Sequence, residues 1–131
     1  MYGRNRYKQD RLDTAQPGDL IVMLYDGMLK FMDLAIEGCE DTDPAKLGVN
    51  LSKAIDIVAY LQAVLRTDHA PELSESLDHT YTSWSLFLVQ ANMANDADEL
   101  RRIREQMQGL RDAWDEVNRH LTTGNASQES P

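Results

Sequence analysis

Residues 20–39 read LIVMLYDGMLKFMDLAIEGC, a stretch in which apolar side chains recur every three or four positions and also fill many of the places between. This periodicity predicts an α-helix, because residues spaced by three and four share one helical face. Only Asp26, Lys30 and Asp33 mark a polar edge. At about 100° per residue the apolar arc is roughly 260° wide, whereas the stripe of a bundle helix needs about 100°. This helix therefore carries a surplus of apolar surface.

Three further segments show helical periodicity, and prolines or capping residues mark where they begin. Pro17, Pro44 and Pro71 each suit the first turn of a helix, and Asp96 with Glu99 has the spacing of a capping box. The predicted helices are 17–39, 44–66, 71–93 and 96–121. Short connections between long helices favour antiparallel neighbours, so the sequence predicts an all-α fold, an antiparallel up-down-up-down four-helix bundle.

The composition suits one globular domain. The chain has 131 residues, of which 42% are hydrophobic and 27% charged. We divide it into an N-terminal arm at 1–16, a bundle domain at 17–121 and a polar tail at 122–131 that we expect to be disordered. Cys39 is the one cysteine, which excludes an internal disulfide and fits a cytoplasmic location.

The net charge of −9 narrows the range of partners. Such a surface repels phosphate backbones and anionic lipids, so we expect no nucleic acid and no membrane as partners. The apolar run from Leu20 is broken by charges before it could span a bilayer, and residues 1–12 lack the apolar core of a secretory signal. With nucleic acid and membranes excluded, we expect the partner to be another protein.

A four-helix bundle invites the hypothesis of a metal centre. A di-iron site would need glutamate and Glu-x-x-His side chains that point inward. Glu75 with His79, and Glu116 with His120, are four residues apart, but both pairs fall off the apolar faces of their helices. We therefore expect no metal, no cofactor and no enzymatic activity. A metal-binding bundle enzyme remains a rival hypothesis that elemental analysis would test.

The surplus apolar surface extends beyond the first helix. Ile57 and Val64 lie outside the stripe of the second helix, and Leu86, Phe87 and Val89 lie outside that of the third. Large exposed apolar patches usually mark interaction sites. The N-terminal arm, a second copy or a guest helix could cover this surplus. Ordinary core filling is the plainer interpretation of any single residue, whereas the whole excess across three helices favours a groove. A self-associating structural bundle without a client is the alternative function.

Several motifs resemble the flagellar secretion chaperones called FliS. Residues 14–27 (TAQPGDLIVMLYDG) are similar to the opening of that family, 77–81 (LDHTY) and 88–92 (LVQAN) to its third helix, and 110–114 (LRDAW) to its closing Leu-x-x-x-Trp. The resemblance covers about residues 7–121. The chain departs from the family pattern at 70–72 (APE), at Ser76 and at Arg4.

The resemblance implies a function. Such chaperones bind the C-terminal segment of flagellin in the cytoplasm, prevent its premature polymerisation and deliver it to the flagellar type III export gate. The guest wraps as helices around an elongated bundle, and the N-terminal arm occupies part of the groove when flagellin is absent. This scheme is recognition of a helix in a groove. We expect a monomer or weak homodimer in the absence of a guest.

Together, the surplus and the resemblance predict a partner-binding groove. Its residues are Ile21, Tyr25, Met28, Leu29, Met32, Leu77, Tyr81, Trp84, Leu88 and Asn92, and the arm residues are Tyr7 and Leu12. Trp84 suits the core as well as the groove, and Asn92 suits the end of the third helix as well as a guest contact. A charge at Tyr25 or Met32 is predicted to abolish guest binding and leave the helices intact.

Overall fold

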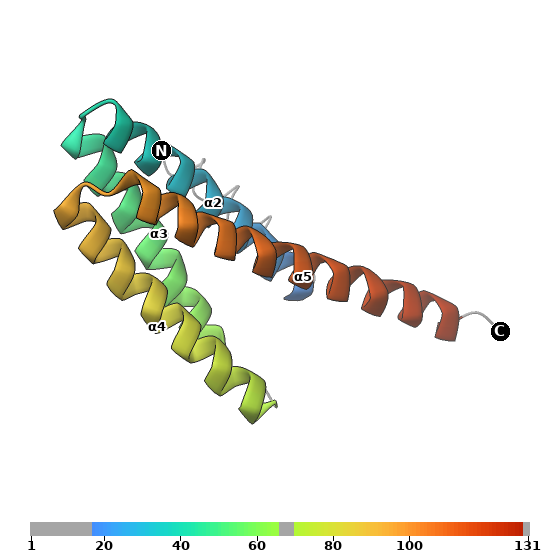
Figure 1. Ribbon diagram of the computed structural model, residues 1–131. Helices are drawn as coiled ribbons and strands as arrows, with labels where there is room; N and C mark the ends of the chain where they lie inside the picture. Colours follow the sequence, from blue (N-terminus) through green and yellow to red (C-terminus); the bar gives the residue numbers. More distant parts are fainter. Residues whose placement is uncertain (1–16, 66–69, 130–131) are drawn as a thin grey trace, which may run out of the picture.

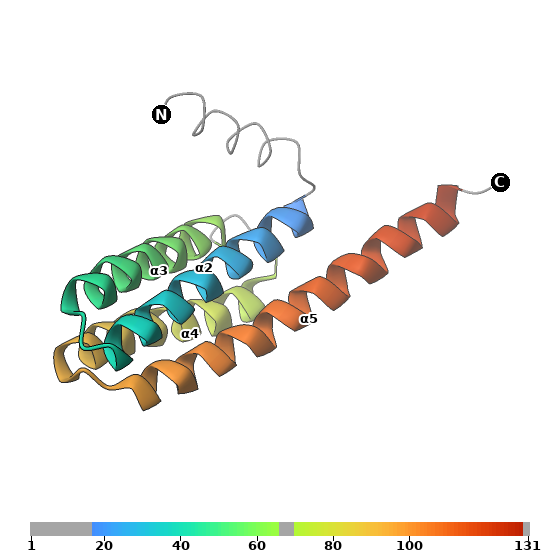
Figure 2. The ribbon, with the colours of Figure 1, turned by 90° about the horizontal axis from the view of Figure 1, so that it is seen from above.

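The computed structural model describes residues 17–65 and 70–129, with side chains for 18–65 and 70–120. Four helices run through these residues (Figures 1 and 2): α2 (Pro17–Glu40), α3 (Pro44–Leu65), α4 (Pro71–Ala94) and α5 (Ala97–Glu129). No strand occurs in these two ranges. The predicted all-α four-helix bundle is confirmed. Residues 1–16, which include Tyr7 and Leu12, lie outside the described residues.

The helices α2 and α4 end in the same way. Thr42 and Asn95, just beyond them, adopt left-handed backbone angles, with φ of 57° and 53°. The residue after each donates its backbone N–H to the carbonyl oxygen five residues earlier, at 2.8 Å and 3.0 Å. These bonds form a Schellman motif, which satisfies the last carbonyl groups of a helix. Each motif reverses the chain in very few residues, as an antiparallel bundle requires.

The next helix begins within the same turn in both places. The Asp43 carboxylate accepts the backbone N–H of Lys46 at 3.1 Å, and the Asp96 carboxylate accepts that of Glu99 at the same distance. Each aspartate therefore caps the N-terminus of its helix. In a capping box the side chain of Glu99 would accept the backbone N–H of Asp96. Here it accepts a hydrogen bond from Arg102 Nε at 2.9 Å, which lowers the pKa of the Glu99 carboxyl.

The core joins all four helices, with α2 packed between α3 and α5. Close approach of α2 to α3 depends on Gly38, because a Cβ there would lie 2.7 Å from the backbone nitrogen of Leu47. The buried side chains of α2 are Val22, Tyr25, Met28, Leu29, Met32, Ala35, Ile36 and Cys39. The protein's own helices thus bury much of the surplus predicted for this segment, and ordinary core filling is the correct interpretation of these eight residues.

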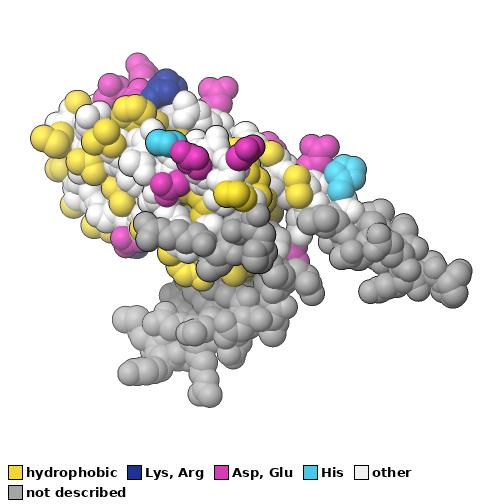
Figure 3. All heavy atoms as spheres, turned by 90° about the horizontal axis from the view of Figure 1, so that it is seen from below, with side chains coloured by type: hydrophobic (Ala, Val, Ile, Leu, Met, Phe, Trp, Pro, Cys, Tyr) yellow, Lys and Arg dark blue, Asp and Glu magenta, His cyan; other side chains and the backbone are white. Residues whose placement is uncertain are grey.

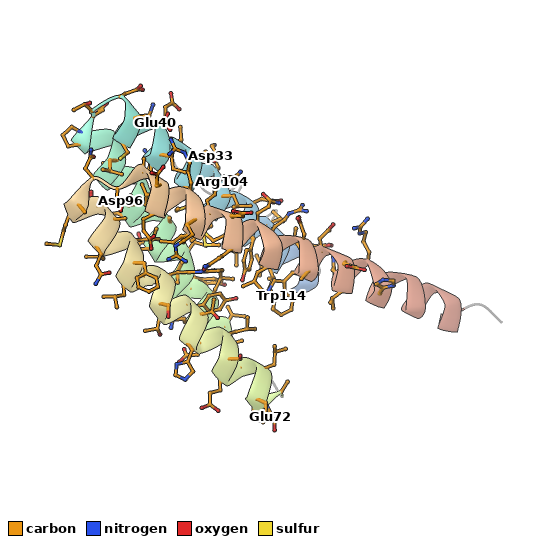
Figure 4. The ribbon with its side chains drawn as sticks, viewed as in Figure 1. Asp33, Glu40, Glu72, Asp96, Arg104 and Trp114 are labelled. Atoms are coloured by element: carbon orange, nitrogen blue, oxygen red, sulfur yellow. The ribbon has the colours of Figure 1, made fainter. Side chains whose placement is uncertain are left out.

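Ion pairs hold α5 against α2. Arg104 binds Asp33 (Figure 4), with its second nitrogen 3.2 Å from the carboxylate. Arg111 Nε lies 2.8 Å from Asp26. One step further along, the Asn118 amide donates to Asp19 at 2.5 Å. These contacts recur every seven residues along both helices, in opposite directions. Exposed ion pairs of this kind contribute at most about 1 kcal/mol each, so they select the orientation of α5 more than they stabilise it.

The last helix is longer than predicted and leaves the bundle. Its backbone is helical to Glu129, about two turns past the predicted end near Leu121 and through the segment expected to be a disordered tail. Propagation of an existing helix costs little, which explains why weak helix formers such as Thr122 and Gly124 do not end it. Figure 1 shows α5 and α4 diverging from their shared turn, so the start of α4 lies far from the end of α5.

Candidate functional site

Two tyrosines from opposite corners of the bundle meet in its interior. The hydroxyl oxygens of Tyr25 (α2) and Tyr81 (α4) are 2.8 Å apart, and their side chains are 0% and 2% exposed. The Trp84 ring lies edge-on to Tyr25, with centroids 6.3 Å apart, and tilted against Tyr81 at 5.5 Å. Its indole N–H donates to Gln106 Oε1 of α5 at 3.0 Å. This aromatic cluster therefore links three helices.

Burial is the main cause that shifts the ionisation of both hydroxyls. It raises the pKa of Tyr25 and of Tyr81 above the usual value, because the phenolate would lose its hydration. The neighbouring Tyr81 hydroxyl raises the pKa of Tyr25 further, whereas a hydrogen bond with the Trp114 side chain lowers the pKa of both tyrosines. Trp114 of α5 thus reaches the pair from the side on which α4 and α5 separate (Figure 4).

We predict that the protein loses stability in alkali through this pair. Because the pKa of each buried tyrosine is raised on folding, its stabilising contribution is complete below about pH 10 and falls as the pH rises further. The slope grows as the unfolded tyrosines ionise and has a limit of about 1.4 kcal/mol per pH unit for each tyrosine. Urea titrations at pH 8, 10 and 11 measure it. The double variant Tyr25→Phe/Tyr81→Phe should show a flatter decline, and Tyr60→Phe, at an exposed position, should not.

Beyond the aromatic cluster, the bundle opens where α4 begins and α5 departs. Apolar side chains there change from half-buried to exposed. We call this surface the divergent end and define it by Ile21, Leu24, Leu73, Leu110, Trp114 and Val117. Leu73 and Val117 are each 50% exposed. Up to Met107 the apolar stripe of α5 is fully buried, so the exposure starts only in its second half. Such a surface can bind an apolar helix.

The predicted groove residues take two positions in the structure. Eight of the ten are buried, namely Tyr25, Met28, Leu29, Met32, Leu77, Tyr81, Trp84 and Leu88. Of the other two, Ile21 is half-buried and Asn92 is exposed. The reason is that α2 and α4 face each other across the bundle instead of lying side by side. The predicted groove is thus interior rather than open surface, and its contact with a partner stays a prediction.

The histidine pairs weighed as metal ligands lie at the surface. Glu75 and His79 are exposed on α4, and His120 Nε2 lies 3.7 Å from Glu116 Oε1 on α5. Among the described residues, no three side chains of His, Cys, Asp or Glu are placed to hold a metal ion. The helices that the structure describes include none with the length and apolar character to cross a membrane.

The apolar residues of the divergent end were not among the predicted groove residues, except Ile21. Leu73, Leu110 and Val117 fit the apolar stripes of their helices, and periodicity alone assigns such residues to a closed core. Their exposure depends on where α4 and α5 separate. No local sequence pattern predicts over how many residues two helices stay in contact, so the separation of α4 and α5 could not be predicted.

Comparison with known proteins matches the chain to a family of flagellar proteins. The family model described as "Flagellar protein FliS" matches residues 1–121. A "Flagellar secretion chaperone FliS" of Bacillus subtilis is 39% identical over 108 residues, which cover 82% of this chain and 80% of the relative. Proteins of the same name from Escherichia coli and Salmonella typhimurium are 33% and 31% identical, over 79% and 80% of this chain and 76% and 78% of their own.

Proposed function

Because this chain belongs to the FliS family of flagellar proteins, we propose that it is a cytoplasmic export chaperone for flagellin. In this proposal it binds the C-terminal helical segment of flagellin, prevents premature polymerisation and delivers the segment to the flagellar type III export gate. It acts by binding and not as an enzyme. The family match across residues 1–121 is the observation that carries the proposal.

The exposed apolar side chains support the divergent end as the place where the guest first binds. Its side chains come from α2, α4 and α5, so a guest that lies in the angle between α4 and α5 could contact more than one helix. Leu73 and Val117 are already half buried, so burial of the rest of each side chain would contribute about 1 kcal/mol before the cost of ordering the guest. A disordered guest needs several such contacts, because its ordering opposes binding.

The aromatic cluster lies directly beneath this surface. Trp114 contacts the Tyr25–Tyr81 pair from α5, so movement of the second half of α5 would uncover the tyrosines and the neighbouring Leu77. The predicted groove residues could then join the interface after the first contact. This order of events reconciles their burial here with the proposed role. Tyr7 and Leu12 are proposed to act from the N-terminal arm, and both lie outside the residues that the structure describes.

The binding proposal is tested with the purified full chain and a recombinant C-terminal segment of flagellin. Light scattering coupled to size exclusion gives the mass of each sample. We expect a monomer or weak dimer for the chain alone, and with the segment a complex whose mass equals the sum of the two. If the segment leaves the mass unchanged while the chain alone forms larger assemblies at higher concentration, the alternative of a self-associating structural bundle is correct.

A further inference from the structure

The outer face of α4 carries a second apolar surface, remote from the divergent end. Leu86, Val89 and Met93 are 54%, 47% and 84% exposed. Their spacing of three and four residues places them on one line of the helix. That line lies opposite the one formed by Tyr81, Trp84 and Leu88, which faces the core. We call these three residues the outer stripe.

The other half of the same face is acidic. Glu72, Glu75 and Asp78 precede the outer stripe, and α4 contains no lysine or arginine over its whole length. Asp78 accepts a hydrogen bond from the neutral amide of Gln62 at 3.1 Å. Within the described residues no cation forms an ion pair with any of the three carboxylates. Figure 3 shows this face, with hydrophobic side chains gathered towards one end and acidic side chains nearer the middle.

We propose that this face docks an amphipathic helix of a partner protein whose apolar residues lie in one half and whose lysines or arginines lie in the other. From Glu72 to Met93 the face is about 32 Å long, which matches a helix of about 22 residues. Apolar contact with the outer stripe supplies burial. Complementary charge over the acidic half sets the direction in which the partner helix lies.

A second copy of this chain is the poorer occupant. The same face of another α4 would bring three more carboxylates and no lysine or arginine, so no pairing of the two faces could neutralise the acidic half. The net charge of −9 adds to the repulsion. The partner is therefore a different protein with a basic segment, and the outer stripe lies apart from the flagellin site proposed above.

The probe is an end-blocked, fluorescently labelled peptide of about 22 residues, with three leucines spaced by three and four in one half and three lysines equally spaced in the other. Its binding to the full chain is followed by anisotropy. The double variant Leu86→Glu/Val89→Glu should weaken binding at least about tenfold. Val49→Glu, at an equally exposed apolar position on α3, is the matched control and should have no effect.

A second variant tests the acidic half. Glu72→Gln/Glu75→Gln should weaken binding and reduce its dependence on salt, and a peptide with glutamates in place of its lysines should not bind. The proposal is overturned if the parent chain does not bind the peptide, or if the outer-stripe variant binds it as well as the parent does. Loss of flagellin binding in that variant would assign the stripe to the flagellin site. Displacement of the probe by a peptide of residues 1–16, which holds four basic residues, would make the chain's own segment the occupant.

Discussion

Glutamate at both Leu73 and Val117 should weaken binding of the flagellin C-terminal segment at least about a hundredfold and leave the helices intact. Both side chains are half exposed at the divergent end, so the free protein tolerates the change. In the complex, each glutamate would replace an apolar contact and would lose its hydration without a partner charge. Isothermal titration calorimetry measures the affinity, and circular dichroism confirms the fold.

The control for this pair is Val49→Glu, which adds a charge at an exposed apolar position of α3 away from the divergent end. It should bind the segment with the affinity of the parent chain. Unchanged affinity in the Leu73→Glu/Val117→Glu variant would show that the divergent end does not receive the guest, whether or not the family function holds.

The second large effect concerns folding. Met32→Asp should unfold the protein, because Met32 is fully buried in the core and a carboxylate there has no partner. We expect a loss of about 4–5 kcal/mol or more, against a total stability of about 5–15 kcal/mol for an ordinary domain. Thermal unfolding followed by circular dichroism measures it. Lys30→Asp, two residues away at an exposed position, should melt close to the parent temperature.

This result would correct the expectation that a charge at Tyr25 or Met32 abolishes binding and spares the helices. That expectation assigned both residues to an open groove, whereas both are buried. A Met32→Asp variant that kept its cooperative melting transition would contradict the packing of α2 described above.

The helices could be predicted from sequence because their boundaries depend on local chemistry. The prolines at 17, 44 and 71 and the cap at Asp96 act within one turn, and each predicted start agrees with the structure to within one residue. The predicted ends at 39, 66 and 93 are equally close. The predicted end of α5 near Leu121 is wrong, because the helix continues to Glu129. Small polar residues signal a helix stop only weakly when a long helix precedes them.

The site was harder to predict, because it depends on how helices are placed around one another. Periodicity showed that the segment 20–39 has apolar residues on several sides, but a helix in contact with three others and a helix with an open groove share that pattern. Asp26 and Asp33 illustrate the difficulty. Both are exposed, as a polar edge requires, yet each also binds an arginine of α5, and periodicity within 20–39 does not predict that contact.

The polar contacts between α2 and α5 also specify the register of this antiparallel pair. Since an acidic residue and its partner recur every seven positions, a slide of α5 by one turn would separate Asp33 from Arg104 and Asp26 from Arg111 together. The third contact in the series, Asp19 with Asn118, has an uncharged donor. Ion pairs therefore fix the register of α5 less strongly towards its C-terminal half. The apolar residues of that half can pack against another surface without breaking an ion pair with α2.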